Sequence, residues 1–530
     1  MNDMKEKLDV AKKLASRGKV SRRDFVQLAI AAGLSIPAAN AMFVAAARAE
    51  PKKGGHFRIG TAHGTTSDSL DPATYLDPMM GTVGWGFSSN GLTEIDTAGK
   101  IIPDLAESFE PSEANKVWAY TLRKGVQFHN GKEVTAEDVV ASFQHHMGPD
   151  SKSAAKSVLA SIADVKADGN KVIFTLSGPN GDFPYLTSDY HLPIMPAKDG
   201  KADWQSAVRT GPYMIGKVDP GVRAHLTRNP NYYRDAWFDE VSVITISDVA
   251  ARTNALVSGE VDYIDRCDLK TLDMLKVSSD LEITQTTGYG HYILAMITTM
   301  APFNDPNIRN AIKFAIDREE ISQKVFAGIN PPGNDNPIAP SVKFATNPEP
   351  IHKYDPERAK SLLKKAGLEK LSIDLSVADI AFAGAVDTGT LIREQARAAG
   401  IDVNVVREAD DGYWDNVSMK KPFCASFTNG RPTADWQFTL YYAAGAAWNE
   451  TYWSNDRFNE LLSQARSETD EATRAAMYAE MQQIIHDDGG LINLVWSTYV
   501  SANSKKLAHG TIASNWDLDG QKIANRWWFA

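Results

Sequence analysis

The side chains best suited to chemistry lie in one short segment, SFTNGRPTADWQF, at residues 426–438. Arg431 offers a planar guanidinium that can hold a carboxylate through two parallel hydrogen bonds. Asp435 offers a charge for an amine or for hydroxyl groups, and Trp436 beside it offers an aromatic face. This set predicts recognition of a small organic solute rather than a covalent reaction. The alternative is an ordered surface loop in which Asp435 caps a helix that begins at Trp436.

The elements before this segment predict a parallel sheet that would position it. LSIDLSV at 371–377 and IDVNVV at 401–406 are typical of strands, and LIREQARAAG at 391–400 is typical of a helix between them. A strand–helix–strand order requires a parallel pair, and ligands of such sheets bind beyond the carboxyl ends of the strands. The segments that follow strand ends are 378–387, 408–414 and 426–438.

A change of pattern near residue 301 divides the chain into two folding units. Strand-like runs and turns precede it, and alternating helices and strands follow it. Asp305 can cap a helix whose first position suits Pro306. The 530 residues also exceed what one hydrophobic core holds. We therefore expect two lobes, with the chain crossing between them near residues 301–306 and 497–503.

Residues 117–143, VWAYTLRKGVQFHNGKEVTAEDVVASF, predict a strand, a tight turn at Asn130-Gly131 and a helix. Thr135 and Asp138 have the spacing of a capping box at the start of that helix. The segment closely resembles the LRxGVxFxxGxxxTAxDVxxSF signature of the family 5 extracellular solute-binding proteins, the dipeptide-, oligopeptide- and nickel-binding components of ABC importers. Residues 301–321, APFNDPNIRNAIKFAIDREEI, resemble the PFxDxxVRxA…AIDRxxI run of the same family.

The resemblance covers about residues 54–510. It implies an α/β fold, namely the two-lobed periplasmic binding protein fold of type II in its large three-subdomain variant, with mixed sheets and a hinged cleft. The expected parts are an export signal (1–49), lobe 1 in three pieces (50–95, an accessory subdomain at 96–204, and 205–305), lobe 2 (306–498) and a return to lobe 1 (499–530).

The resemblance also implies which side chains face the solute. In the family's peptide binders an acidic residue in this region neutralises the amino terminus of the peptide. Asn429 takes its usual place here, which leaves Asp435 as the nearby carboxylate, so the solute need not be an ordinary peptide. Trp85 is expected either in the cleft or in the core. The expected ligand-binding residues are Asp435, Trp436, Arg431, Asn429, Asn449, Trp85, Tyr289 and Trp496.

The function implied is capture of a small-molecule solute by hinge closure and its delivery to an ABC permease and its ATPase. A peptide, an opine-like conjugate or an oligosaccharide would fit.

We expect no cofactor, no catalytic residue and no metal site, since the sequence lacks G-x-S-x-G, H-E-x-x-H and Walker motifs, and His145 and His146 fall on different sides of their helix. A secreted hydrolase, or a periplasmic sensor or chaperone subunit of the same fold, remains the alternative.

The N-terminus predicts export. Arg22 and Arg23 precede a mildly apolar run that closes with Ala47-Arg48-Ala49, which resembles a twin-arginine signal cleaved after Ala49 and predicts a periplasmic protein. A transmembrane anchor is disfavoured because Gly33, Ser35, Pro37 and Asn40 interrupt the run.

The mature part of the chain is acidic. Residues 1–49 contain nine basic and four acidic residues, so the remainder has 47 basic and 62 acidic residues and a net charge of −15. This charge argues against nucleic acid as a partner, and we expect a monomer. Cys267 and Cys424 are expected to be unpaired, because twin-arginine substrates fold in a reducing compartment.

Overall fold

The computed structural model describes residues 22–31, 51–75, 78–148, 151–153, 155–156, 159–269, 271–409, 412–446 and 448–530. The predicted export signal and its cleavage site lie outside these residues, apart from helix α2 (Arg22–Ala31). Within the ranges described, the helices are too short or too polar to cross a membrane.

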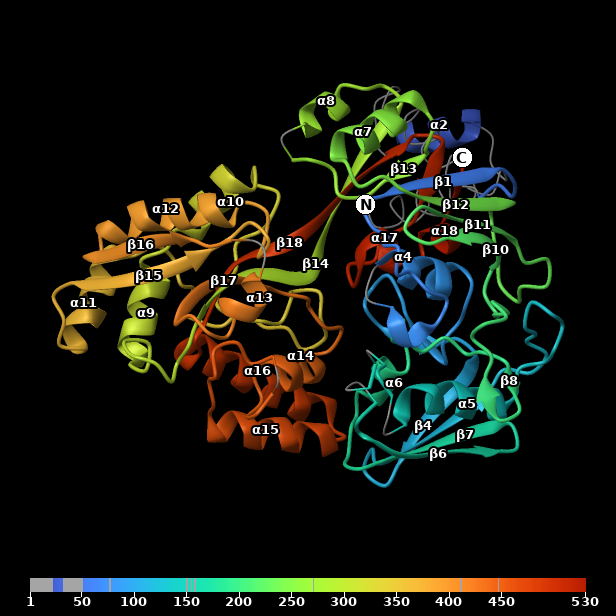
Figure 1. Cartoon of the computed structure of the whole chain (residues 1–530), viewed down its shortest axis with the longest axis horizontal. Helices are drawn as coiled ribbons and strands as arrows, with labels where there is room; N and C mark the ends of the chain where they lie inside the picture. The colour runs from blue at the N-terminus through green and yellow to red at the C-terminus, as the bar shows by residue number, and fades with distance from the viewer. Residues whose placement is uncertain are drawn as a thin grey trace.

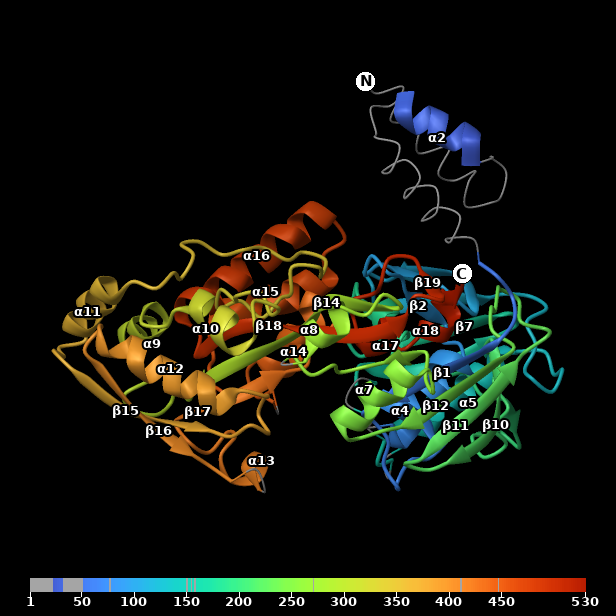
Figure 2. The same cartoon turned by 90° about the horizontal axis from the view of Figure 1, so that it is seen from above.

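A ten-stranded mixed sheet extends through both lobes (Figure 1). Seen from above, the lobes lie side by side and β14 and β18 join them (Figure 2). The strand order is β10 (Tyr213–Asp219), β11 (Arg223–Arg228), β12 (Glu240–Thr245), β1 (His56–Thr61), β13 (Tyr263–Ile264), β18 (Leu491–Ser504), β14 (Leu281–Met296), β17 (Phe423–Thr428), β15 (Leu371–Val377) and β16 (Ile401–Arg407).

The chain passes from lobe 1 to lobe 2 inside strand β14. Leu281 packs against a lobe 1 cluster, whereas Leu294 and Met296 belong to the core of lobe 2. The pairing of β14 with β18 is irregular between Thr287 and His291, where the strand changes lobe. This transition precedes the one expected at residues 301–306, because a continuously paired strand spans both cores without a loop. The return lies in β18.

Lobe 1 is built on β1, which pairs in parallel with both β12 and β13. Helix α7 (Val249–Ser258) connects β12 to β13 in a βαβ unit, begins at the Asp248 cap and ends at Gly259 in the left-handed region. The C-terminal segment packs into the same core. The other elements of this part are η1 (Pro72–Thr74), α4 (Pro78–Met80), η2 (Gly81–Phe87), β2 (Thr93–Ile95), β3 (Ile101–Pro103), α8 (Leu272–Lys276), β19 (Leu507–His509), α17 (Asp517–Gly520), α18 (Ile523–Arg526) and β20 (Trp527–Phe529).

The accessory part of lobe 1 has its own four-stranded antiparallel sheet and its own hydrophobic cluster. Thr135 and Asp138 form the predicted capping box at the start of α5, and this prediction is confirmed. The elements are β4 (Ala106–Ser112), β5 (Val117–Leu122), α5 (Ala136–Met147), β6 (Ile162–Asp168), β7 (Lys171–Leu176), α6 (Phe183–Leu186), β8 (Ala197–Lys198) and β9 (Lys201–Ala202).

Lobe 2 contains the predicted strand–helix–strand unit, with β15 parallel to β16. The Asp305 carboxylate accepts a hydrogen bond from Asn307 N and caps α9, as predicted. Cys267 of lobe 1 and Cys424 of lobe 2 are buried and unpaired, which confirms that expectation. The helices are α9 (Pro306–Phe314), α10 (Arg318–Val325), α11 (Pro356–Lys365), α12 (Ala385–Arg397), α13 (Tyr413–Asn416), α14 (Ala434–Tyr441), α15 (Asp456–Ser467) and α16 (Glu471–Asp488).

Candidate solute-binding site

The predicted recognition segment joins the end of β17 to the start of α14. Thr433 caps α14, because its Oγ1 accepts a hydrogen bond from Trp436 N at 3.1 Å. The alternative in which Asp435 is the cap is therefore wrong. Gly430 lies so close to β14 that an added Cβ would be 2.1 Å from Tyr289 O, so only glycine fits there.

Arg431 lies among three aromatic rings. Its Cζ is 5.7 Å from the ring centre of Trp436 and 5.9 Å from those of Tyr441 and Trp448. Its Nε is buried and has no hydrogen-bond partner among the residues that the structure describes. A buried N–H without an acceptor costs about 1–3 kcal/mol, and an acceptor on a solute would remove that cost. Arg431 is therefore poised to bind an anionic or carbonyl group.

Residues 189–191 of lobe 1 lie near Arg431. Asp189 Oδ1 accepts hydrogen bonds from His191 N at 2.9 Å and from His191 Nδ1 at 2.6 Å. Burial raises the pKa of Asp189, but the charges of His191 and Arg431 act against it, and the pKa lies below its usual value. Burial raises the pKa of the neighbouring Tyr190 hydroxyl, and Arg431 opposes that rise. Trp436 of lobe 2 packs in one cluster with Leu186 and Leu192 of lobe 1, so the two lobes meet near this point.

Trp85 stands at the far end of a row of aromatic rings that starts at Tyr190. The Tyr190 ring lies 5.6 Å from Trp516, which lies 5.7 Å from Trp85, both in edge-on contact. Lys522 Nζ is 4.6 Å from the centre of the Trp85 ring. Trp85 itself is 2% exposed. It therefore supports Trp516 from the core, and Tyr190 and Trp516 are the rings nearer to the lobe junction.

Asp435 and Trp436 are engaged in packing. The Asp435 carboxylate accepts a hydrogen bond from Arg466 Nε at 2.8 Å. Burial raises the pKa of Asp435, and the charge of Arg466 opposes that rise. Trp436 is 7% exposed and belongs to the hydrophobic cluster of the accessory subdomain, although α14 is part of lobe 2. Trp436 therefore packs across the junction of the lobes and also faces Arg431, whereas the Asp435–Arg466 pair lies within lobe 2.

Asn449 and Asn429 differ in how much they could offer a solute. Asn449 Nδ2 donates to Trp453 O at 2.7 Å, and its Oδ1 accepts from Thr451 Oγ1 at 3.1 Å, so its amide is satisfied internally. Asn429 is exposed, and its backbone oxygen accepts a 3.5 Å hydrogen bond from the Tyr441 hydroxyl. Asn429 therefore lies near the aromatic rings around Arg431, whereas the amide of Asn449 is occupied within its own loop.

Tyr289 and Trp496 are buried on the two strands that cross between the lobes. Tyr289 is 2% exposed, and burial raises its pKa to about 12. Trp496 is 5% exposed and packs edge-on against His291, with ring centres 5.0 Å apart. Both belong to a lobe 2 cluster, so the structure places their side chains in the packing next to the crossing point.

Glu450 is an acidic residue that sequence reasoning missed. Its Oε1 accepts a 2.9 Å hydrogen bond from Ser426 Oγ at the end of β17, and its buried Oε2 has no partner in the described part of the chain. Burial raises the pKa of Glu450 to about 7, and the Ser426 hydrogen bond limits the rise. Burial raises the pKa of the Tyr441 hydroxyl, Arg431 lowers it and Glu450 raises it, so both charged groups lie near Tyr441. The only sequence signal was its position next to Asn449.

A sequence profile of the bacterial extracellular solute-binding proteins, family 5 middle, matches residues 100–453, which include the recognition segment. The chain belongs to this family. The resemblance inferred from residues 117–143 and 301–321 is thereby confirmed. Family 5 also accounts for the mixed α/β, two-lobed fold described above.

Curated relatives and solved structures agree with this membership. The glutathione-binding protein GsiB of Escherichia coli K12 is 25% identical over 467 residues, which cover 85% of this chain and 91% of GsiB. AgaA of A. tumefaciens R10, solved with agropinic acid, is 25% identical with a TM-score of 0.72, covering 89% of this family 5 chain and 98% of AgaA. DppA of Helicobacter pylori, solved with the peptide STSA, is 23% identical with a TM-score of 0.72, covering 90% of this chain and 98% of DppA.

Proposed function

We propose that the protein is the periplasmic solute-binding component of an ABC importer, and that it binds a small peptide-like solute whose anionic group pairs with Arg431. The observation that carries this proposal is the buried Arg431 Nε, which lacks an acceptor among the described residues and lies within a ring of three aromatic side chains. A carboxylate would accept the fork of hydrogen bonds, and the rings would cover the apolar part of the solute.

The relatives support this chemistry. GsiB is named for glutathione, AgaA was solved with agropinic acid and DppA with a tetrapeptide, and each of these compounds carries at least one carboxylate. A solute with an ammonium group would also need an acid. Because Asp435 is paired with Arg466, Glu450 is the better candidate for that role. It would do the work of the acidic residue whose usual place in the family's peptide binders is occupied here by Asn429.

Hinge closure would deliver the solute to the permease in a recognisable form. Polar contacts that join the accessory subdomain to lobe 2 include the Asp182–Arg474 ion pair at 3.0 Å and a hydrogen bond from Gly181 N to Arg466 O at 3.1 Å. A solute that contacts both lobes would add to these contacts only in the closed form and would shift the population toward it.

A melting-shift screen tests the proposal on the exported protein. The compounds are peptides, opine-like amino-acid conjugates, oligosaccharides and metal chelates. We expect carboxylate-bearing peptides or conjugates to stabilise the protein, by about 2.7 kcal/mol at a hundredfold excess over Kd, and neutral oligosaccharides to have no effect. The bound compound should be recovered unchanged, because no reaction is expected. Absence of any shift with carboxylate-bearing compounds, or their conversion to products, would contradict the proposal.

A further inference from the structure

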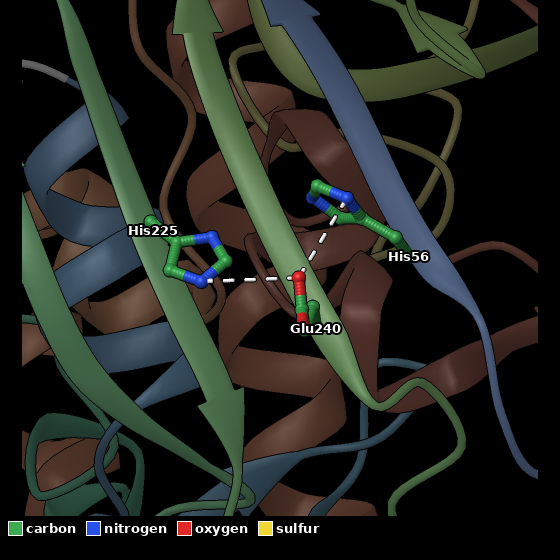
Figure 3. A group of neighbouring side chains, drawn as sticks. All are labelled: His56, His225 and Glu240. Carbon is green, nitrogen blue, oxygen red and sulfur yellow. Dashed lines mark ion pairs between the residues drawn. The ribbon is translucent and has the colours of Figure 1, made fainter.

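Three side chains with metal-binding atoms meet on the solvent-facing side of the lobe 1 sheet (Figure 3). His56 begins β1, Glu240 begins β12, and His225 lies in β11. His56 and Glu240 are partners in the parallel pairing of β1 with β12. The residues that follow two of them, Phe57 and Val241, are 0% exposed and point into the core. The alternation of the strands therefore places all three side chains on the outer face.

Glu240 stands between the two imidazoles, as Figure 3 shows. Its Oε2 is 3.8 Å from His56 Nδ1 and 3.9 Å from His225 Nε2. All three ligand atoms lie within 4.8 Å of one another. Bonds of about 2.0–2.1 Å to a tetrahedral ion require ligand atoms to be about 3.3 Å apart. The side chains are between 37% and 48% exposed, so small rotations can bring them to that spacing.

Ser242 orients both rings from the side opposite Glu240. Its Oγ lies 2.8 Å from His56 Nε2 and 3.2 Å from His225 Nδ1. A serine hydroxyl has two acceptor lone pairs, so it can accept an N–H from each ring at the same time. In that arrangement His56 Nδ1 and His225 Nε2 both have free lone pairs directed at Glu240. Metal-bound histidines are commonly held through their second ring nitrogen in this way.

The charges around the three residues do not oppose a cation strongly. Arg58 is the nearby cation on β1, and it is held by Asp262 through hydrogen bonds of 3.0 Å from Nε and 2.8 Å from Nη2. The Arg58 charge is therefore balanced by the Asp262 carboxylate and repels a bound cation only weakly.

We propose that His56, His225 and Glu240 bind one divalent first-row transition-metal ion such as Zn²⁺, with Ser242 positioning the two imidazoles and water completing the coordination. Two imidazoles and one carboxylate suit Zn²⁺, Ni²⁺ or Cu²⁺ and are poor ligands for Mg²⁺ or Ca²⁺, which prefer oxygen. Binding releases any proton carried on His56 Nδ1 or His225 Nε2. The site belongs to lobe 1 alone and is independent of the proposed solute contact at Arg431.

Calorimetric titration of the metal-free exported protein, purified without an affinity tag, tests this proposal with Zn²⁺ as the probe. We expect one ion to bind near neutral pH and binding to weaken in acid, because protonated imidazoles do not ligate. His225→Gln and Glu240→Gln should each lower the Zn²⁺ affinity at least tenfold, and Ser242→Ala should lower it about tenfold. His509→Gln removes a histidine of the same lobe outside the cluster and should have no effect.

A spectroscopic measurement keeps the test independent of folding effects. With Cu²⁺ as the probe, electron paramagnetic resonance should detect two nitrogen ligands in the wild type and one in His225→Gln, a variant whose circular dichroism should be unchanged. The proposal is overturned if the wild type binds no Zn²⁺ at millimolar concentration. It is also overturned if a folded His56→Gln/His225→Gln double variant binds Zn²⁺ as tightly as the wild type.

Discussion

The Asp182 carboxylate lies 3.0 Å from the Arg474 guanidinium, and this ion pair connects the accessory subdomain of lobe 1 to helix α16 of lobe 2. The two side chains are 10% and 9% exposed. Arg474 Nε also donates to Ala465 O at 3.0 Å, so the arginine is anchored within its own lobe. Opening of the hinge would break the pair and expose Asp182 to water. The pair is therefore a contact between the lobes that hinge opening would have to break.

Asp182→Asn should favour the open form. The substitution removes one charge of a mostly buried pair, and we expect solute affinity to fall about tenfold, or about 1.4 kcal/mol, because closure becomes less favourable. Small-angle X-ray scattering of the unliganded variant should give a larger radius of gyration. Asp164→Asn, which alters an exposed acid of the same subdomain, is the matched control. Unchanged affinity and unchanged scattering would contradict a role in closure.

Arg431→Gln should weaken binding of an anionic solute at least tenfold without lowering the melting temperature of the unliganded protein. The variant loses the contacts of the guanidinium with three aromatic rings but also removes a buried N–H that has no acceptor in the described part of the molecule, so we expect the two effects to offset each other. Arg431→Lys keeps the charge but loses the planar fork and should be intermediate. Calorimetric titration provides the affinities. Arg457→Gln, at an exposed ion pair of α15, is the control, and equal losses in both variants would argue against a solute contact.

Asp435→Ala distinguishes solute binding from packing. Because the Asp435 carboxylate is buried and paired with Arg466, we expect its removal to lower the free energy of unfolding by about 1–3 kcal/mol. Denaturant titration and calorimetric titration on the same variant measure both effects. If affinity instead falls at least tenfold while stability is retained, Asp435 contacts the solute, as its place in the recognition segment predicts.

Glu450 should make stability depend on pH. Its pKa is raised from 4.5 to about 7 by burial, so the folded state holds the proton more tightly than the unfolded state does. The stabilisation from this group is fully present below about pH 4.5 and is lost as the pH rises to about 7, by on the order of 2–3 kcal/mol. Glu450→Gln should reduce the pH dependence of the free energy of unfolding, as measured by denaturant titrations between about pH 4.5 and about pH 7. Glu460→Gln, at an exposed site on α15, should leave the pH dependence of stability unchanged. If plots of stability against pH are parallel for the wild type and both variants, Glu450 is not the cause.

Local features of the fold were predictable because their causes are local. The capping box of Thr135 and Asp138 and the Asp305 cap of α9 each depend on residues within one turn. The crossing between the lobes was misplaced because the pattern change near residue 301 marks the first helix of lobe 2. The chain had already entered lobe 2 along β14, a fact that depends on pairing with the distant strand β18.

The sequence by itself determined the family, the α/β class and the segment that contains Arg431, since a signature, a periodicity and a set of residue types can all be recognised without coordinates. Only the tertiary structure decided what surrounds Arg431, because residues 189–191, Tyr441 and Trp448 come from other parts of the chain. It also paired Asp435 with Arg466 and brought His56, His225 and Glu240 to one face of a sheet. Strand register and lobe packing create these contacts between residues far apart in sequence, and such contacts have no local signal in the residues that make them.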